Sequence, residues 1–295
     1  MRSLRLILGS ISLVLAATLA FGQATLGIVA GTVTDNSGAV VVGATITAHR
    51  TEGGEERTAN SGPNGEYRLE ALTPGTYRVT VSAPNFSATE LTGVVVSASI
   101  TTPANVKLEV GKTTETVTVE ASAQQVQTET GDLSAVIPQV EIKDLPIATG
   151  NPYDLAKTLP GVLVGDSRTT GFSNGAEFSV DGLRARANNF LIDGFDNNDY
   201  GITGQALQPT NQEAVSEVTV LKNSYAAEYG RGGGSVSNLT FRSGSNTLHG
   251  ALWEQYSGNA LFAVTPEEAA SGLTKTPHAV NNLFGFRVGG RLIVA

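Results

Sequence analysis

The residue types that most often carry chemistry in proteins are few and scattered in this chain. The three histidines, His49, His249 and His278, lie in different segments, without the short spacing that metal ligands or a catalytic pair require. The chain has no cysteine, which excludes disulfide bonds and thiolate metal sites. We therefore expect no catalytic, cofactor-binding or metal-binding residue.

Three short strings have the letters of a functional motif but lack its context. Residues 171–175, GFSNG, match a nucleophile elbow, yet no strand is predicted before them and no helix after them. The acidic run at 193–199 lacks the order and the distal glutamate of a calcium loop. The glycines at 230–234 lack the Gly-Lys-Ser/Thr ending of a phosphate loop. An enzyme is thus the least favoured class of protein.

The first 24 residues predict a secretory signal peptide. Arg2 and Arg5 precede an apolar run at 6–21, and small residues follow around Gly22 and Ala24. The run is interrupted and too short for a spanning helix of about 20 residues. Cleavage would remove two positive charges from a chain whose net charge is already -8. A chain this acidic is not expected to bind nucleic acid.

Residues 26–111 alternate apolar and polar side chains with period 2, between turn signals at 36–38, 63–65 and 74–75. This pattern predicts antiparallel sheets packed on one core, as in a small β-sandwich. The positions expected on the buried faces are Ala44, Ile46, Ala48, Tyr67, Leu69, Ala71, Tyr77, Val79, Val81, Ala83, Val106, Leu108 and Val110.

Two strings in this region, GTVTDNSGAVVVGATITAHR and NGEYRLEALTPGTYRVTVSAPNF, resemble the carboxypeptidase regulatory-like domain. The resemblance implies a transthyretin-like antiparallel β-sandwich of seven strands, also grouped with starch-binding-like folds. It implies a binding or spacer module without catalytic residues. Gly43 and Gly75 would allow turns, and Tyr67 and Tyr77 would anchor the core.

A short extended stretch follows in a segment rich in Thr, Glu and Gln. Its residues, Glu115, Thr116, Val117, Thr118 and Val119, resemble the TonB box, the peptide that pairs as an added strand with a periplasmic TonB-type energy-coupling protein. Strand addition relies on backbone hydrogen bonds and places few demands on side chains. The alternative, an ordinary strand of the sandwich or of the next domain, therefore stays open.

Residues 112–245 are expected to contain this linker, the TonB-box-like strand and a mixed α+β domain. Asn151 and Pro152 predict the start of one short helix, and Asn211 predicts a second helix over 211–217 that leads into a strand at 218–221. Residues 227–234 predict a flexible backbone, suited either to packing against a wall or to rearranging.

Three long strings in this region resemble the plug domain of TonB-dependent receptors, and especially the Oar-like subgroup that places a regulatory-like sandwich before the plug. They are LPIATGNPYDLAKTLPGV, FSVDGLRARANNFLIDGFDNND and EAVSEVTVLKNSYAAEYGRGGGSVSNLTFRSGSNTLHG. The resemblance implies a plug inside a barrel. Arg184, Arg186, Arg231 and Arg242 would then either pair with acidic groups of the barrel wall or stay solvated.

Residues 246–295 predict the first strands of a transmembrane β-barrel. Phe284, Phe286 and Val288 alternate with Gly285 and Arg287, which indicates an apolar outer face and a polar inner face. Trp253 and Tyr256 are expected near an interface girdle. Two strands cannot close a barrel in lipid, so we expect a truncated barrel and an incomplete chain.

These observations predict a mainly β protein: a sandwich, an α+β plug and an incomplete barrel. We expect the N-terminal part of a TonB-dependent receptor in the cell outer membrane, with an energy-coupling partner and an extracellular ligand, for which the resemblance of the sandwich favours an oligosaccharide. The alternative is a secreted or surface binding module for carbohydrate or protein, without transport. A continuation of the chain through further barrel strands would favour the receptor.

Overall fold

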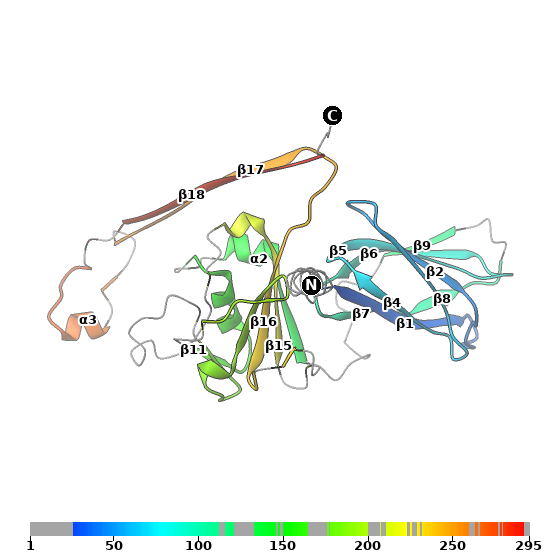
Figure 1. Ribbon diagram of the computed structural model, residues 1–295, viewed down its shortest axis with the longest axis horizontal. Coiled ribbons are helices and arrows are strands. Elements are labelled where there is room, and N and C mark those ends of the chain that lie inside the picture. The colour runs from blue at the N-terminus through cyan, green and yellow to red at the C-terminus, as the bar shows by residue number, and fades with distance from the viewer. Residues whose placement is uncertain are drawn as a thin grey trace, which may run out of the picture.

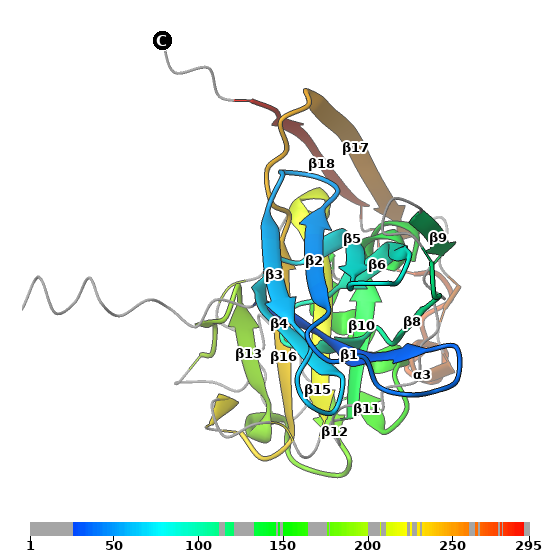
Figure 2. The same ribbon diagram turned by 90° about the vertical axis from the view of Figure 1, so that its right-hand side faces the viewer.

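The computed structural model describes residues 26–111, 116–120, 133–145, 147, 150–164, 176, 178–199, 207, 211–222, 225, 229–230, 232–259, 263–264, 266–276, 278 and 280–291. The expected signal peptide and residues 171–175 lie outside them. The described elements form three groups, a β-sandwich, a second sheet with short helices, and a long hairpin that lies above the second sheet in the view of Figure 1 and is also seen in Figure 2.

The sandwich consists of two sheets that pack face to face. One has the order β4-β1-β7, with β8 also paired to β1, and the other has the order β3-β2-β5-β6-β9. The pairs β1–β7, β1–β8 and β6–β9 are parallel, and the remaining pairs are antiparallel. The strands are β1 Gly27–Asp35, β2 Thr45–Arg50, β3 Glu56–Asn60, β4 Glu66–Leu72, β5 Gly75–Ser82, β6 Ala88–Val96, β7 Thr101–Pro103, β8 Val106–Leu108 and β9 Thr116–Glu120.

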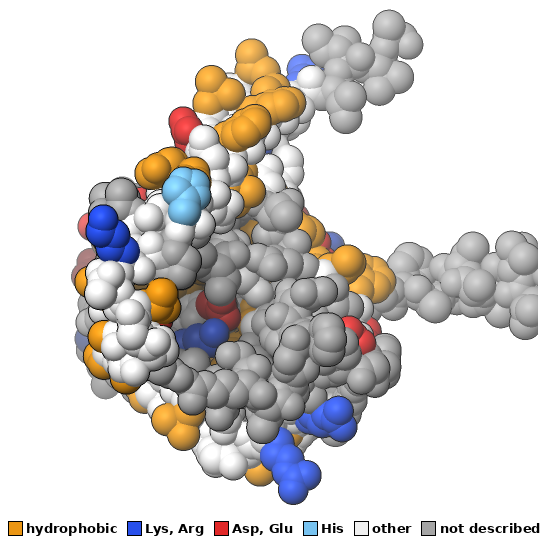
Figure 3. Space-filling model, turned by 90° about the vertical axis from the view of Figure 1, so that its left-hand side faces the viewer, with side chains coloured by type: hydrophobic (Ala, Val, Ile, Leu, Met, Phe, Trp, Pro, Cys, Tyr) orange, Lys and Arg blue, Asp and Glu red, His pale blue; other side chains and the backbone are white. Residues whose placement is uncertain are grey.

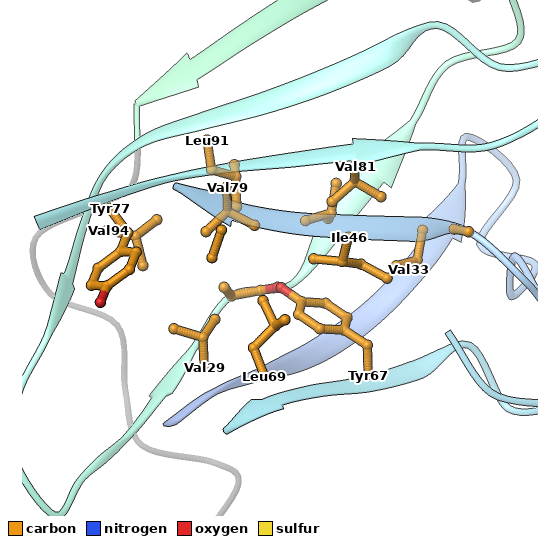
Figure 4. Close-up of a cluster of buried hydrophobic side chains, with 14 of the residues drawn as sticks. Val29, Val33, Ile46, Tyr67, Leu69, Tyr77, Val79, Val81, Leu91 and Val94 are labelled. Atoms are coloured by element: carbon orange, nitrogen blue, oxygen red, sulfur yellow. The ribbon is translucent and has the colours of Figure 1, made fainter. Parts of the chain in front are cut away.

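The core of the sandwich is built from the alternating apolar residues of both sheets, as the sequence predicts (Figure 4). The hydroxyls of both predicted anchors donate to backbone carbonyls, that of Tyr67 to Ala104 O at 2.5 Å and that of Tyr77 to Thr73 O at 2.8 Å. The predicted alternation fails at two positions. Ala71 has a φ of 57°, which turns it outward and buries Leu72 instead, and Val110 lies beyond β8 and is exposed.

The second group is a five-stranded sheet with the order β10-β15-β16-β13-β14, in which only the β13–β16 pair is parallel. A separate pair, β11–β12, packs beside it. The elements are β10 Leu133–Pro138, α2 Gln139–Asp144, η1 Pro152–Thr158, β11 Val162–Val164, β12 Phe178–Val180, η2 Ala185–Ala187, β13 Asn189–Ile192, β14 Phe195–Asp196, η3 Gln212–Ala214, β15 Val215–Lys222 and β16 Ser235–Phe241.

Both predicted helices of this domain exist, but as 3₁₀ helices. The Asn151 side chain accepts from the Tyr153 N–H at 3.2 Å, and the Asn211 side chain accepts from the Glu213 N–H at 3.1 Å. The second helix ends at Ala214, and the strand begins at Val215, three residues earlier than predicted. Backbone pairing of β15 with strands on both sides overrides the local helical signal there.

The third group is an antiparallel hairpin of β17 His249–Gly258 and β18 Val280–Gly289, with α3 Pro266–Ala270 in its connection. Phe284, Phe286 and Val288 are each at least 70% exposed, whereas Gly285 and Arg287 between them are half-buried. The predicted alternation of β18 is thus confirmed. Among the described residues, no helix has the length and apolar character needed to cross a membrane.

Candidate functional site: the plug and its contacts

The TonB-box-like residues occupy an edge of the sandwich. Residues 116–120 form β9, which runs parallel to β6 and pairs with it from Ala88↔Thr116 to Thr92↔Glu120, whereas Glu115 lies outside the described residues. Val117 and Val119 are 37% and 43% exposed. In the described part of the chain no further strand pairs with β9, so its outer backbone edge is open.

The sheet of the second domain is buried on both faces and contains many polar side chains. The Asn198 side chain is the centre of one network. Its Oδ1 accepts from the Phe190 backbone N–H at 3.0 Å, and its Nδ2 donates to Asn189 Oδ1 at 2.7 Å. The Asp193-Gly194 turn is tied to β16, because the Phe241 N–H donates to Asp193 at 2.9 Å and the Gly194 N–H donates to Asn238 at 3.1 Å. These amides fix one arrangement of the strands.

The glycine-rich segment before β16 is packed closely against the rest of the domain. A Cβ on Gly232 would lie 2.4 Å from Ala187 O, and one on Gly234 would lie 2.6 Å from Asn188 Oδ1. The Tyr225 hydroxyl donates to Gly232 O, and Tyr225 and Tyr229 pack on a small cluster of Leu191, Leu221 and Val236. Glycine therefore serves close approach at 232 and 234 rather than the flexibility expected there.

The hairpin contacts this domain through its inner face. Arg287 Nη2 lies 3.7 Å from Glu213 Oε2, and Lys143 Nζ lies 2.8 Å from Glu213 Oε1. Gln255 Nε2 donates to Ile147 O at 3.3 Å. Glu213 is buried in η3, so two cations, one on α2 and one on β18, compensate one buried carboxylate just before β15.

The four arginines were expected either to pair with acidic groups of a barrel wall or to stay solvated, and the exposure of three of them fits the second alternative. The Arg242 guanidinium donates to Gln139 Oε1, Arg184 and Arg186 are exposed, and Arg231 lies outside the described residues. The cation that meets an acidic partner across the hairpin contact is instead Arg287. The sequence gives no signal that Glu213 pairs with Arg287, because the two residues are far apart in the chain.

The outer face of the hairpin is mostly apolar, with Glu254 and Asn282 as polar exceptions. Hydrophobic side chains gather on the upper part of the face seen in Figure 3, where the hairpin lies. Tyr256 is on this outer face, but Trp253 is on the inner face, against Gly285, whose Cβ would lie 2.6 Å from the indole ring. Glu254 is exposed on the outer face, opposite Phe284.

The sandwich and the second domain meet at Glu217 of β15. Its Oε1 accepts from the Ala98 N–H at 2.7 Å, and the residue is buried. Burial raises the pKa of the Glu217 carboxyl, while hydrogen bonds from Ala98 and Ser97 oppose the rise. The Glu217 carboxylate is thus buried at the junction, where the sandwich and the second domain are in contact.

The residues singled out for chemistry stay apart. His49 is in β2 and His249 is in β17, where its Nδ1 lies 2.8 Å from Thr247 O. Within the described ranges, no group of three His, Asp or Glu residues is placed to hold a metal ion. The described residues instead form a set of contacts between domains.

Comparison with known proteins identifies the two domains. Residues 28–109 match the model of the carboxypeptidase regulatory-like domain, and residues 109–236 match that of the TonB-dependent receptor plug domain. The TonB-dependent transporter Oar of Myxococcus xanthus is 25% identical over 304 aligned positions, which cover 97% of this chain. The chain spans 28% of the length of that relative.

Among solved structures, the siderophore receptor PirA from Acinetobacter baumannii is 25% identical, with a TM-score of 0.39, over 54% of this chain and 22% of its own. The ferric enterobactin receptor of Pseudomonas aeruginosa, in complex with enterobactin, is 22% identical with the same TM-score and coverage. The order of the two matched domains and the Oar relative carry the assignment. The chain therefore carries a carboxypeptidase regulatory-like domain followed by a TonB-dependent receptor plug domain, and in this order it resembles the N-terminal part of a TonB-dependent receptor.

Proposed function

We propose that the chain is the periplasmic and plug part of an outer-membrane receptor that takes up an extracellular ligand with energy from a TonB-type partner. In this proposal residues 1–24 are the export signal, 26–111 the sandwich, 112–245 the coupling strand and plug, and 246–295 the first barrel strands. The plug match and the transporter relative support the receptor class.

The observation that carries the proposal is the position of β9. It lies near the start of the region that matches the plug, a few residues after the regulatory-like match ends, and at the edge of a sheet, with its outer backbone edge open in the part of the chain that the structure describes. An open edge accepts another strand through backbone hydrogen bonds. We assign this edge as the place where the partner adds its strand.

A pull on β9 would act on the plug through the chain segment that joins β9 to β10. The chain runs from Glu120 through residues 121–132 to Leu133, where β10 begins, and β10 is an edge strand of the plug sheet. Force on an edge strand separates its hydrogen bonds with one neighbour, here β15, before it reaches the rest of the sheet. Coupling at β9 would thus rearrange β10 first.

The two faces of the hairpin support the proposal that β17 and β18 lie in the membrane. Its apolar face points away from the plug and its Arg287 and Gln255 face points toward it, which is the arrangement expected for barrel strands between lipid and a polar interior. As ligand class we propose an oligosaccharide, from the resemblance of the sandwich to starch-binding-like folds.

Single-cysteine cross-linking tests the partner site. The chain has no cysteine, so Val117→Cys and Val119→Cys each introduce one reactive group on β9. We expect both to form disulfides with cysteines placed along the terminal strand of the periplasmic energy-coupling protein in cells. Glu56→Cys, exposed on β3 at the opposite edge of the same sheet, is the matched control and should not cross-link.

Cross-linking at β3 as strong as at β9 would overturn the assignment of β9. Absence of any cross-link, in a chain that folds and fractionates away from the outer membrane, would overturn the receptor proposal and favour the secreted binding module. Cross-links at β9 in the outer-membrane fraction support both the location and the coupling.

A further inference from the structure

A cavity of about 330 Å³ lies at the junction of the sandwich and the plug. The sandwich contributes residues 50–52 and 74–76, and the plug contributes the starts of α2 and β15 and the end of β16. The nearby bond from the Ala98 N–H to Glu217 holds the two domains together. The cavity therefore exists only when both domains are folded and docked.

Two guanidinium groups line the cavity from opposite domains. Arg50 Nη2 donates to Pro74 O at 3.1 Å, and its buried Nε has no hydrogen-bond partner. Arg242 donates to Gln139 Oε1. In the described part of the chain neither arginine makes an ion pair, and Glu52 supplies the only carboxylate among the residues lining the cavity. A buried donor without a partner is costly unless a ligand or water satisfies it.

The position of Arg50 is fixed by the fold around it. The guanidinium lies over Gly75, where an added Cβ would be 2.9 Å from Nε. The Thr51 N–H donates to Thr76 O at 2.9 Å, which joins the two turns that form the sandwich side of the cavity. The Arg50 guanidinium is thus positioned by two hydrogen-bonded turns.

The lining specifies the chemistry of a ligand. Guanidinium forks bind carboxylate and phosphate oxygens, and the hydroxyl-bearing residues Thr51, Thr76, Ser216 and Ser243 complete the lining. No aromatic residue lines the cavity, so stacking on a sugar ring is not available. A volume at the lower end of the usual range for ligand pockets fits a molecule of monosaccharide size.

We propose that this junction binds a small hydroxylated anion, a sugar acid or a sugar phosphate, whose carboxylate or phosphate lies between Arg50 and Arg242. The site is separate from the partner edge at β9 and stands independently of the coupling proposal. A ligand here contacts both domains and would hold the sandwich against the plug, because it binds only the docked arrangement.

Calorimetric titration of the full chain tests the site, with galacturonate and glucose 6-phosphate as anionic probes and glucose as the neutral one. We expect one or both anions to bind and glucose not to bind. Arg242→Gln should weaken the binding at least tenfold, because it removes one of the two cations. Arg184→Gln, an exposed plug arginine away from the cavity, should bind as the parent chain does.

Arg50→Lys provides a second variant, since it keeps the charge but loses the paired N–H donors of the guanidinium. Its affinity for the anions should lie between that of the parent and that of Arg242→Gln. Circular dichroism of each variant shows whether it is folded. Binding by glucose equal to that of the anions, equal affinity of the parent and Arg242→Gln, or no binding of any probe to the folded parent would each overturn the proposal. The stronger of the two anions distinguishes carboxylate from phosphate recognition.

Discussion

The sandwich and the plug are both built on β-sheets, but they are held together by different interactions. In the sandwich most buried side chains are apolar, and the buried polar ones are serines and threonines. The hydroxyls of Tyr67 and Tyr77 donate to backbone carbonyls. In the plug, strands β13, β15 and β16 carry buried Asn, Ser, Thr and Glu beside their apolar residues. The plug therefore depends on specific polar pairs and close backbone contacts, where the sandwich depends on apolar area.

This difference suits the two positions in the chain. In the proposed receptor, an apolar core would let the sandwich tolerate small shifts without leaving a polar group unpaired. The plug would exchange internal hydrogen bonds for bonds to water when it rearranges, so polar interfaces would lower the free-energy cost of that change. Three substitutions test the comparison.

The largest expected effect is on the sandwich core. Leu69→Ala removes a side chain that is 2% exposed, and we expect a loss of about 3 kcal/mol of unfolding free energy, as for other buried leucines. Hydrogen exchange should rise in β1 and β4 while β15 and β16 keep their protection. Leu183→Ala in the plug, at an exposed position, is the control and should cost below about 0.5 kcal/mol. Equal loss of protection in both domains would show that they unfold as one unit.

An intermediate effect is expected at the glycine segment of the plug. Gly232→Ala places a Cβ against Ala187 O, and overpacking of this kind costs about 2 kcal/mol. Gly233→Ala meets nothing within 4 Å and should leave the stability unchanged or slightly raised. Urea denaturation of the two variants measures the difference. Matching midpoints would mean that the segment is not packed as described.

The smallest effect is expected at the junction, and it depends on pH. Because burial raises the folded-state pKa of Glu217, its contribution to stability is greatest below the unfolded pKa and is lost as the pH rises through the folded one. Glu217→Gln keeps a carbonyl to accept from Ala98 and removes the charge. Its melting temperature should exceed that of the parent increasingly from pH 4 to pH 7. A difference that is constant with pH would contradict the burial of the charged group.

Local sequence patterns predicted much of the fold, but they did not predict where individual strands begin and end. The alternation of Tyr77, Val79 and Val81 needed only the period of a strand, and the caps at Asn151 and Asn211 needed only neighbouring residues. The inward turn of Leu72 and the early start of β15 were not predictable, because each depends on which strand lies alongside. The same holds for the candidate contacts: Arg287 was placed on the inner face, but its partner Glu213 was not foreseen.

By itself the sequence determined the class of each segment: the sandwich, the plug strings, the alternating hairpin and the absence of clustered histidines or any cysteine. These properties follow from residue type and spacing, which act over a few residues. Only the tertiary structure decided that Thr116–Glu120 pairs with β6, that Glu217 meets Ala98, and that Arg50 and Arg242 face one cavity. Each joins residues far apart in the chain, and such pairs are set by packing, which no local pattern encodes.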